Sequence, residues 1–211
     1  MKYLKDDFVL HLVDNSLDEK ADEMRETADL YTIEYLRGPS ETREHPDALN
    51  LAARVAVERE YEFYMFLDHD IFLRKKCRVV PILKRVGFYG IGQYHAPTQS
   101  QYIWPGLFGV SRDWLSDRYL NFGGIRADNK RDDGDCGSLN AHLFHDEDWR
   151  NLHGILDHGY GFLRAPDSFG LQSFGYEQMG PWLHLSNSSH WMVVPEPEER
   201  DRLASALIAS L

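Results

Sequence analysis

Cysteine and long apolar runs are both scarce in this 211-residue sequence. The two cysteines, Cys77 and Cys136, are too few and too far apart for a disulfide framework or a cysteine-rich zinc site. No stretch approaches the roughly 18 apolar residues of a membrane span. The N-terminal apolar run follows two aspartates and is broken by His11, which is unlike a signal peptide. We therefore expect a protein of a reducing, cytoplasmic compartment.

Positive charge is also in short supply. The sequence has 23 Lys and Arg against 34 Asp and Glu, which gives a formal net charge of −11. This balance disfavours a nucleic-acid binder, because affinity for phosphate backbones comes largely from clustered cations. A nucleotide is still a possible ligand where a metal ion or a helix N-terminus supplies a local positive field.

Several common catalytic motifs are absent. Gly87, Gly90 and Gly92 have the wrong spacing for G-x-G-x-x-G or a P-loop, and H-E-x-x-H does not occur. The composition is instead that of one folded globular domain, with 43% hydrophobic and 27% charged residues.

Strand and helix patterns alternate over the first seventy residues. Short β-rich runs at 8–13, 30–36 and 61–67 are separated by helical patterns at 17–28 and 45–60. This alternation predicts an α/β protein with a compact, mostly parallel central sheet flanked by helices. Further on, 79–86 and 88–94 fit either helix or strand, and 102–110 fits a strand pair around Pro105-Gly106. The segments 138–144, 149–158 and 199–211 fit helices.

Polar residues follow two of the predicted strands. Asp14-Asn15 ends the first strand, and Asp68-His69-Asp70 ends the third, entirely apolar strand. In parallel sheets ligands gather at the carboxyl ends of strands. Two aspartates one residue apart on an extended segment point to the same side, so they can share a cation with a diphosphate. A D-x-D tripeptide is more often a solvated turn, and its position after a buried strand is what favours a metal site.

Four segments together resemble the GT-A nucleotide-sugar glycosyltransferases. The segment 66–72, FLDHDIF, is similar to their D-x-D region, and 104–112, WPGLFGVSR, to the strand and turn that line the acceptor side. The segment 135–139, DCGSL, resembles a later acidic loop-to-helix junction, and 182–185, WLHL, a late segment that supplies a histidine to the metal. The resemblance covers about residues 8–192 and implies a GT-A fold, with a nucleotide-binding half at about 1–75 and an acceptor-binding half at about 76–195.

The resemblance also implies roles for individual residues on the donor side. Asp70 would bind Mn²⁺ or Mg²⁺ directly, and Asp68 would contact the ribose or reach the metal through water. His184 would be the third protein ligand, although a structural histidine in a Trp-rich core is an equal alternative. The remaining donor-side candidates, for the nucleotide of a UDP-sugar, are Asp14, Asn15, Arg37 and His69. A helix-leading turn is the alternative for Asp14-Asn15, and a surface arginine the alternative for Arg37.

On the acceptor side the resemblance points to an aspartate and two aromatic residues. Asp135 would be the general base of an inverting enzyme, or an orienting group in a retaining one. Tyr102 and Trp104 have flat apolar faces that suit sugar stacking, although strand aromatics are more often core residues. The acceptor itself would be a hydroxyl of a glycan or glycoprotein.

A narrower similarity is to the chlorovirus-encoded glycosyltransferases that build the glycan of the viral capsid protein. It rests on size, acidity and the D-H-D variant, and it implies a host-cytoplasmic enzyme whose chain continues past Leu211 into further domains.

Other functions remain open. His142 and His145, three residues apart, fit a metal-dependent hydrolase, although ten histidines in the chain make such a pair unsurprising. A nucleotidyltransferase that makes an activated sugar would also need a diphosphate-metal site, but it would carry a Gly-rich basic loop where this chain has Asp14-Asn15-Ser16. A non-enzymatic glycan-binding module with a structural metal is the third alternative.

Overall fold

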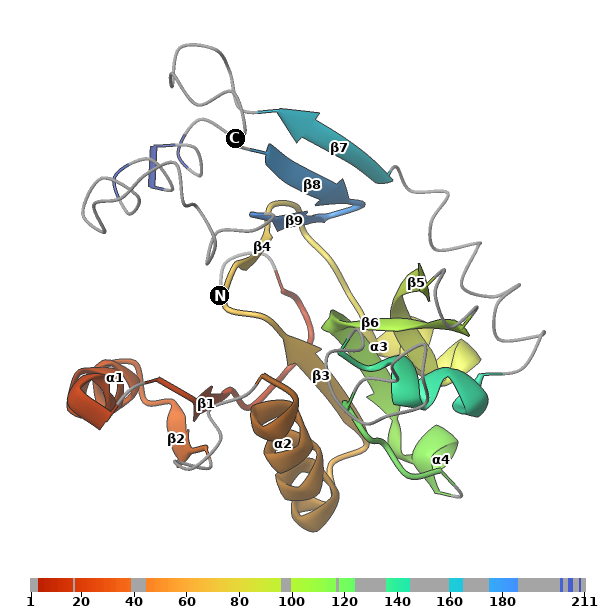
Figure 1. Cartoon of the computed structure of the whole chain (residues 1–211), viewed down its shortest axis with the longest axis horizontal. Coiled ribbons are helices and arrows are strands. Elements are labelled where there is room, and N and C mark those ends of the chain that lie inside the picture. The colour runs from red at the N-terminus through yellow and green to blue at the C-terminus, as the bar shows by residue number, and fades with distance from the viewer. Residues whose placement is uncertain are drawn as a thin grey trace. The chain divides into compact units, whose positions relative to one another are not determined.

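The chain is a mixed α/β protein in a computed structural model (Figure 1). The structure describes residues 4–16, 18–38, 45–95, 100–116, 118–123, 136–144, 160–164 and 175–185, together with positions 202, 205, 206 and 209. These residues form two compact units, each built from separate stretches of chain. Unit 1 comprises Met1–Lys5, Asp68–Arg78 and His153–Leu211, and unit 2 comprises Asp6–Leu67 and Val79–Leu152.

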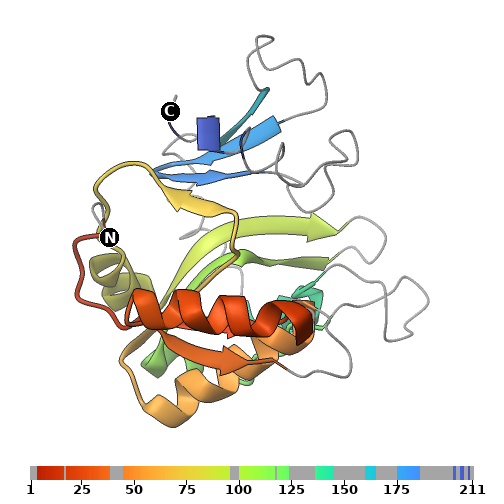
Figure 2. The ribbon, with the colours of Figure 1, turned by 90° about the vertical axis from the view of Figure 1, so that its left-hand side faces the viewer.

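Unit 2 begins with a β-α-β motif, as the sequence pattern predicts. Strand β1 (His11–Asp14) pairs in parallel with β2 (Glu34–Arg37), and α1 (Asp18–Leu30) connects them. Helix α2 (His45–Arg59) follows, and α1 and α2 lie on opposite sides of the two strands (Figures 1 and 2). The parallel register places Asp14 directly beside Arg37, so the carboxyl ends of both strands carry charged residues.

The second sheet of unit 2 is antiparallel. Strand β6 (Ser100–Ser111) pairs with β3 (Phe63–Leu67) on one side and with β5 (Phe88–His95) on the other. The expected strand pair around Pro105-Gly106 is thus one long strand. The β5 register shifts between Gly90 and Gly92 opposite this proline, which explains how β6 accommodates a residue without a backbone N–H.

Short helices and an aromatic core complete unit 2. Helix α3 (Val80–Val86) precedes β5, α4 (Arg112–Leu115) follows β6, and the predicted helix near 138 is a 3-10 helix, η1 (Ser138–Leu143). Six aromatic rings from these elements and the adjoining loops contact one another at centroid distances of 5.2–6.4 Å: Phe66, Phe88, Phe108, Trp114, Phe122 and Phe144. Each such pair adds about 0.5–1.5 kcal/mol beyond the burial of its area.

Unit 1 contains an antiparallel sheet with the strand order β4-β9-β8-β7. Its strands are β4 (Ile71–Leu73), β7 (Tyr160–Arg164), β8 (Gly175–Met179) and β9 (Trp182–His184). A two-residue turn joins β8 to β9, where Gly180 takes a φ of 61° that glycine adopts without strain. His184 of β9 pairs with Ile71 of β4, so residues far apart in sequence become neighbours.

The described pairings differ from the expected mostly parallel sheet. One of them, β1 with β2, is parallel, and the remaining described pairs are antiparallel. The third predicted strand, β3, is itself an exception, because it pairs antiparallel with β6 in a sheet separate from β1 and β2. Within the described residues, no helix is both long and apolar enough to cross a membrane.

Candidate functional site

The Asp68-His69-Asp70 tripeptide forms the turn that leads into β4. Asp70 is buried, with 8% of its surface exposed, and the backbone N–H of Leu185 donates to its carbonyl at 3.0 Å. That bond extends the β4–β9 pairing by one residue and places His184 beside the aspartate. The His184 Nε2 atom lies 3.7 Å from Asp70 Oδ1, and both side chains are largely buried.

The spacing of this pair is informative about chemistry. At 3.7 Å the two atoms are too far apart for a hydrogen bond. Two ligand atoms that each lie about 2.1 Å from one cation are roughly 3.0–3.6 Å apart for right-angle to trigonal geometry. Asp70 and His184 therefore fit a shared divalent cation after a small side-chain adjustment, and an imidazole beside a carboxylate suits Mn²⁺ better than Ca²⁺.

The other two residues of the tripeptide differ in exposure. His69 is exposed, whereas Asp68 is half-buried and its carbonyl accepts a hydrogen bond from Ile71 N–H at 3.2 Å. Among the residues that the structure describes, no group of three or more His, Cys, Asp or Glu side chains has the geometry of a metal site. The predicted set of Asp68, Asp70 and His184 is thus represented by one close pair, Asp70 with His184.

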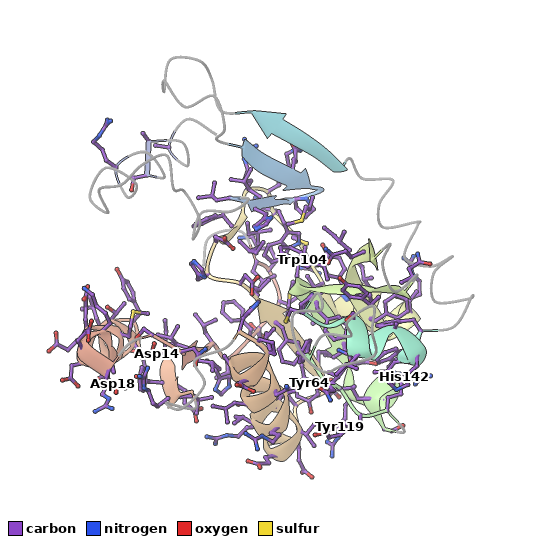
Figure 3. The ribbon with its side chains drawn as sticks, in the orientation of Figure 1. Asp14, Asp18, Tyr64, Trp104, Tyr119 and His142 are labelled. Atoms are coloured by element: carbon purple, nitrogen blue, oxygen red, sulfur yellow. The ribbon has the colours of Figure 1, made fainter. Side chains whose placement is uncertain are left out.

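A second buried aspartate lies in unit 2, at the end of β1 (Figure 3). Asp14 is 3% exposed, and its carboxylate accepts three short hydrogen bonds. Tyr35 Oη donates to Oδ2 at 2.6 Å, Arg37 donates to the same oxygen at 2.8 Å, and the backbone N–H of Ser16 donates to Oδ1 at 2.8 Å. Charge-assisted bonds of this length are about twice as strong as neutral ones.

These contacts shift the acidity of both partners. Burial alone would raise the pKa of Asp14, but the hydrogen bonds from Tyr35 and Ser16 and the charge of Arg37 outweigh it, so the pKa lies below its ordinary value. Burial and the neighbouring carboxylate raise the pKa of the Tyr35 hydroxyl. At neutral pH Asp14 is an anion and Tyr35 is a neutral donor.

Arg37 joins the ends of β1 and β2 to the start of α1. Besides Asp14, its guanidinium donates to the carbonyl of Ser16 and to the carboxylate of Asp18, both at 2.8 Å. These contacts hold the strand ends and the start of α1 together, and the predicted nucleotide contact of Arg37 stays a prediction. Asp14 likewise has the structural role of holding the turn before α1.

Gly38 completes the same strand end. Its N–H donates to the Asp14 carbonyl at 2.7 Å, and a Cβ placed on it would lie 2.9 Å from that carbonyl oxygen and 3.0 Å from Oδ1 of Asn15. A side chain at this position would therefore force the two strand ends apart. Asn15 itself is half-buried beside this glycine.

The two predicted acceptor-side aromatics have different environments. Tyr102 is completely buried in β6, so its ring belongs to the core and has no face for a sugar. Trp104, two residues further along the strand, is half-buried and remains a stacking candidate (Figure 3). The correction for Tyr102 follows from its burial: position 102 of β6 pairs with Gln93 of β5, and the ring leaves no exposed surface.

The predicted base, Asp135, lies outside the described residues. The junction that follows it, at Gly137, is held by backbone contacts. Gly137 has a φ of 87°, and its N–H donates to Phe122 O at 3.0 Å. A Cβ at this position would lie 3.1 Å from Pro105. The Phe122 N–H in turn donates to Asn50 Oδ1 of α2 at 2.9 Å. The start of η1 is thereby attached to both β6 and α2.

His142 of the alternative hydrolase motif is exposed on η1. Its Nδ1 lies 2.8 Å from the carbonyl oxygen of Leu139 in the same helix, so this nitrogen carries the proton and donates. His145 lies outside the described residues. The hydrolase hypothesis therefore gains no second ligand from the described part of the chain.

Sequence reasoning missed Tyr35 and Gly38. Parallel register would have indicated both, because Asp14 pairs with Arg37. Tyr35 lies two residues before Arg37 and therefore on the same face of β2, and Gly38 follows Arg37 directly. A glycine directly after a strand end is a further sign of close backbone approach.

Comparison of the whole chain with protein-family models, curated proteins and solved structures gave no match.

Proposed function

We propose that the chain is a metal-dependent glycosyltransferase that moves a sugar from a nucleotide-sugar, UDP-linked, to a hydroxyl of a glycan or glycoprotein, with a viral capsid glycan as the narrower candidate. The observation that carries the proposal is the buried Asp70–His184 pair, whose atoms lie 3.7 Å apart. Two residues that the resemblance names independently, one from the D-x-D turn and one from the late Trp-Leu-His segment, are neighbours in unit 1.

The β1-α1-β2 motif agrees with the same proposal, because GT-A proteins begin with such a unit. We extend the proposal to a GT-A arrangement of the full sheet and to one catalytic domain with a donor half and an acceptor half. Asn15, beside the close-packed strand end, is the candidate contact for the nucleoside. Asp14 and Arg37 support that strand end through their mutual ion pair.

In the proposed reaction an acceptor hydroxyl attacks the anomeric carbon and the nucleoside diphosphate departs. Bound Mn²⁺ or Mg²⁺ would supply neutralisation of the leaving diphosphate. Asp70 and His184 would hold the ion, and Asp68 would orient the ribose or an ion-bound water. Burial of the pair strengthens its interaction with a cation. Asp135 would accept the acceptor proton if the reaction inverts the anomeric centre.

Calorimetry with UDP, with and without Mn²⁺, tests the proposal on the full chain. We expect UDP binding that requires the metal, followed by metal-dependent release of UDP in a screen of UDP-hexoses and UDP-deoxyhexoses. GDP-sugars are the contrast set. A clean preference for them would change the proposed nucleobase from uracil to guanine and would leave the glycosyltransferase class unchanged. Carbohydrate binding without any metal-dependent nucleotide affinity would instead identify a glycan-binding module and refute the transferase.

A further inference from the structure

A basic turn follows β4 in this acidic protein. Four of the five residues at 74–78 are cations, Arg74, Lys75, Lys76 and Arg78, and none of the five is acidic. Lys75, Lys76 and Arg78 are exposed, and none of the three has a hydrogen bond or ion pair within the described part of the chain. We name residues 74–78 the basic turn.

The backbone of the basic turn is fixed on two sides. Arg74 N–H donates to the carbonyl of Pro181 in the β8–β9 turn at 2.9 Å, and Lys5 N–H donates to the carbonyl of Cys77 at 3.1 Å. Leu4 and Cys77 form a parallel bridge that also brings the N-terminal segment alongside. A charged surface on a fixed backbone loses less conformational entropy on binding than one on a free loop.

We infer that the basic turn binds an anionic glycan, and that the acceptor of the proposed transferase carries carboxylate, phosphate or sulfate groups. The assignment of that glycan as acceptor rests on the proposed function. Strand β4 lies between Asp70 and the basic turn, and the four steps from Asp70 to Arg74, at about 3.3 Å each, separate the two by about 13 Å. A diphosphate held at Asp70 and His184 is therefore distinct from the anion held at Lys75 and Lys76.

Two other polyanions fit the described surface less well. Stable attachment to an anionic membrane usually needs an apolar or lipid anchor in addition to cations. The large apolar side chains that are seen to be exposed belong to unit 2, and residues 68–78 and 178–185 of unit 1 contain none. A nucleic acid is disfavoured by the net charge of −11, and within residues 68–78 and 178–185 no Phe, Tyr or Trp ring is exposed for base stacking.

The test measures binding of an oligogalacturonate to the full chain, with a neutral maltooligosaccharide of equal length as the contrast. We expect binding of the charged oligosaccharide alone, and weakening by added salt because exposed charges are screened. Lys75→Gln/Lys76→Gln should weaken binding about tenfold or more. The matched control is Lys84→Gln/Arg85→Gln, which removes two adjacent exposed cations from α3 in unit 2 and should leave binding unchanged.

Equal weakening by the two double variants would mean general electrostatic attraction and overturn the proposal. Binding to anionic vesicles or single-stranded DNA without binding to oligogalacturonate would overturn the glycan as the occupant. Lysines beside an edge strand also discourage strand addition, so self-association of Lys75→Gln/Lys76→Gln with unchanged oligosaccharide binding would assign the turn that role instead. UDP binding with Mn²⁺ is measured separately, so the transferase can fail while the glycan surface stands.

Discussion

Asp14 and Asp70 are both buried aspartates beside a strand terminus, since Asp14 ends β1 and Asp70 directly precedes β4, but their surroundings differ. Three donors from its own chain lie 2.6–2.8 Å from the Asp14 carboxylate oxygens. Asp70 faces a histidine at 3.7 Å, a spacing that suits shared coordination and is too long for a hydrogen bond. The same residue type, buried beside a strand terminus in each unit, therefore serves stability in unit 2 and, in our proposal, ligand binding in unit 1.

The largest expected effect comes from Asp70. Asp70→Asn keeps the shape of the side chain but removes the anionic ligand, and we expect metal-dependent UDP affinity to fall at least about 100-fold, the upper end of what loss of a supporting metal-site contact costs. Calorimetry with Mn²⁺ measures the change. His184→Gln should act in the same direction, and Asp14→Asn is the matched control with the same chemical change at a buried strand end. Equal loss in both aspartate variants would show that a fold defect explains the effect.

The next effect is on stability and belongs to unit 2. Arg37→Met removes one charge-assisted bond from a buried carboxylate and two more bonds from the α1 start, so we expect a loss of about 2 kcal/mol in the free energy of unfolding. Urea denaturation measures it. Arg112→Met removes an exposed arginine that pairs with Glu60 and should cost much less. If the two variants are equally stable, the contacts of Arg37 with Asp14, Ser16 and Asp18 do not hold the strand end.

The two sites around Asp14 and Asp70 also show which structural features the sequence predicts. Periodic apolar patterns located α1, α2 and the strands up to residue 67, because each has a local signal. Pairing of β4 with β9 depends on contacts between residues more than a hundred positions apart, and no local pattern records it. The resemblance named His184 and Asp70, whereas hydrogen bonding around Asp14, and the burial of Tyr102, required the tertiary structure.

Acid should reduce the difference between wild type and Asp14→Asn. The pKa of Asp14 is lowered in the folded state. Its charged form therefore stabilises the folded protein at every pH above the unfolded pKa of about 3.9, which includes neutral pH. That contribution is lost as the pH falls through the folded pKa. Thermal unfolding from pH 7 to pH 3 should show two curves that converge at low pH. Because the chain has 34 acidic residues, the informative quantity is the difference between variants. A difference that grows toward low pH would be inconsistent with a lowered pKa.

A smaller effect distinguishes rigid from adjustable contacts. Gly38→Ala places a methyl group 2.9 Å from a backbone carbonyl oxygen at the Asp14 strand end, and we expect a loss of about 1–2 kcal/mol. Gly123→Ala meets the end of the Leu139 side chain at 2.8 Å, which can rotate away, so its loss should be smaller. Denaturation of both variants makes the comparison. A more harmful Gly123→Ala would mean that the 118–123 segment is packed more rigidly than the strand end.

The smallest expected effect is at His142. Its ring is exposed and makes one bond, to a carbonyl of its own short helix, so His142→Ala should change stability by about 0.5 kcal/mol or less. Metal-dependent UDP binding should stay at the wild-type level, because the metal in our proposal is held by Asp70 and His184. The decisive measurement is Mn²⁺ affinity with UDP present, compared directly with Asp70→Asn. If His142→Ala loses metal affinity and Asp70→Asn keeps it, the comparison of the two aspartates fails, and the histidine-based hydrolase becomes the better account of this chain.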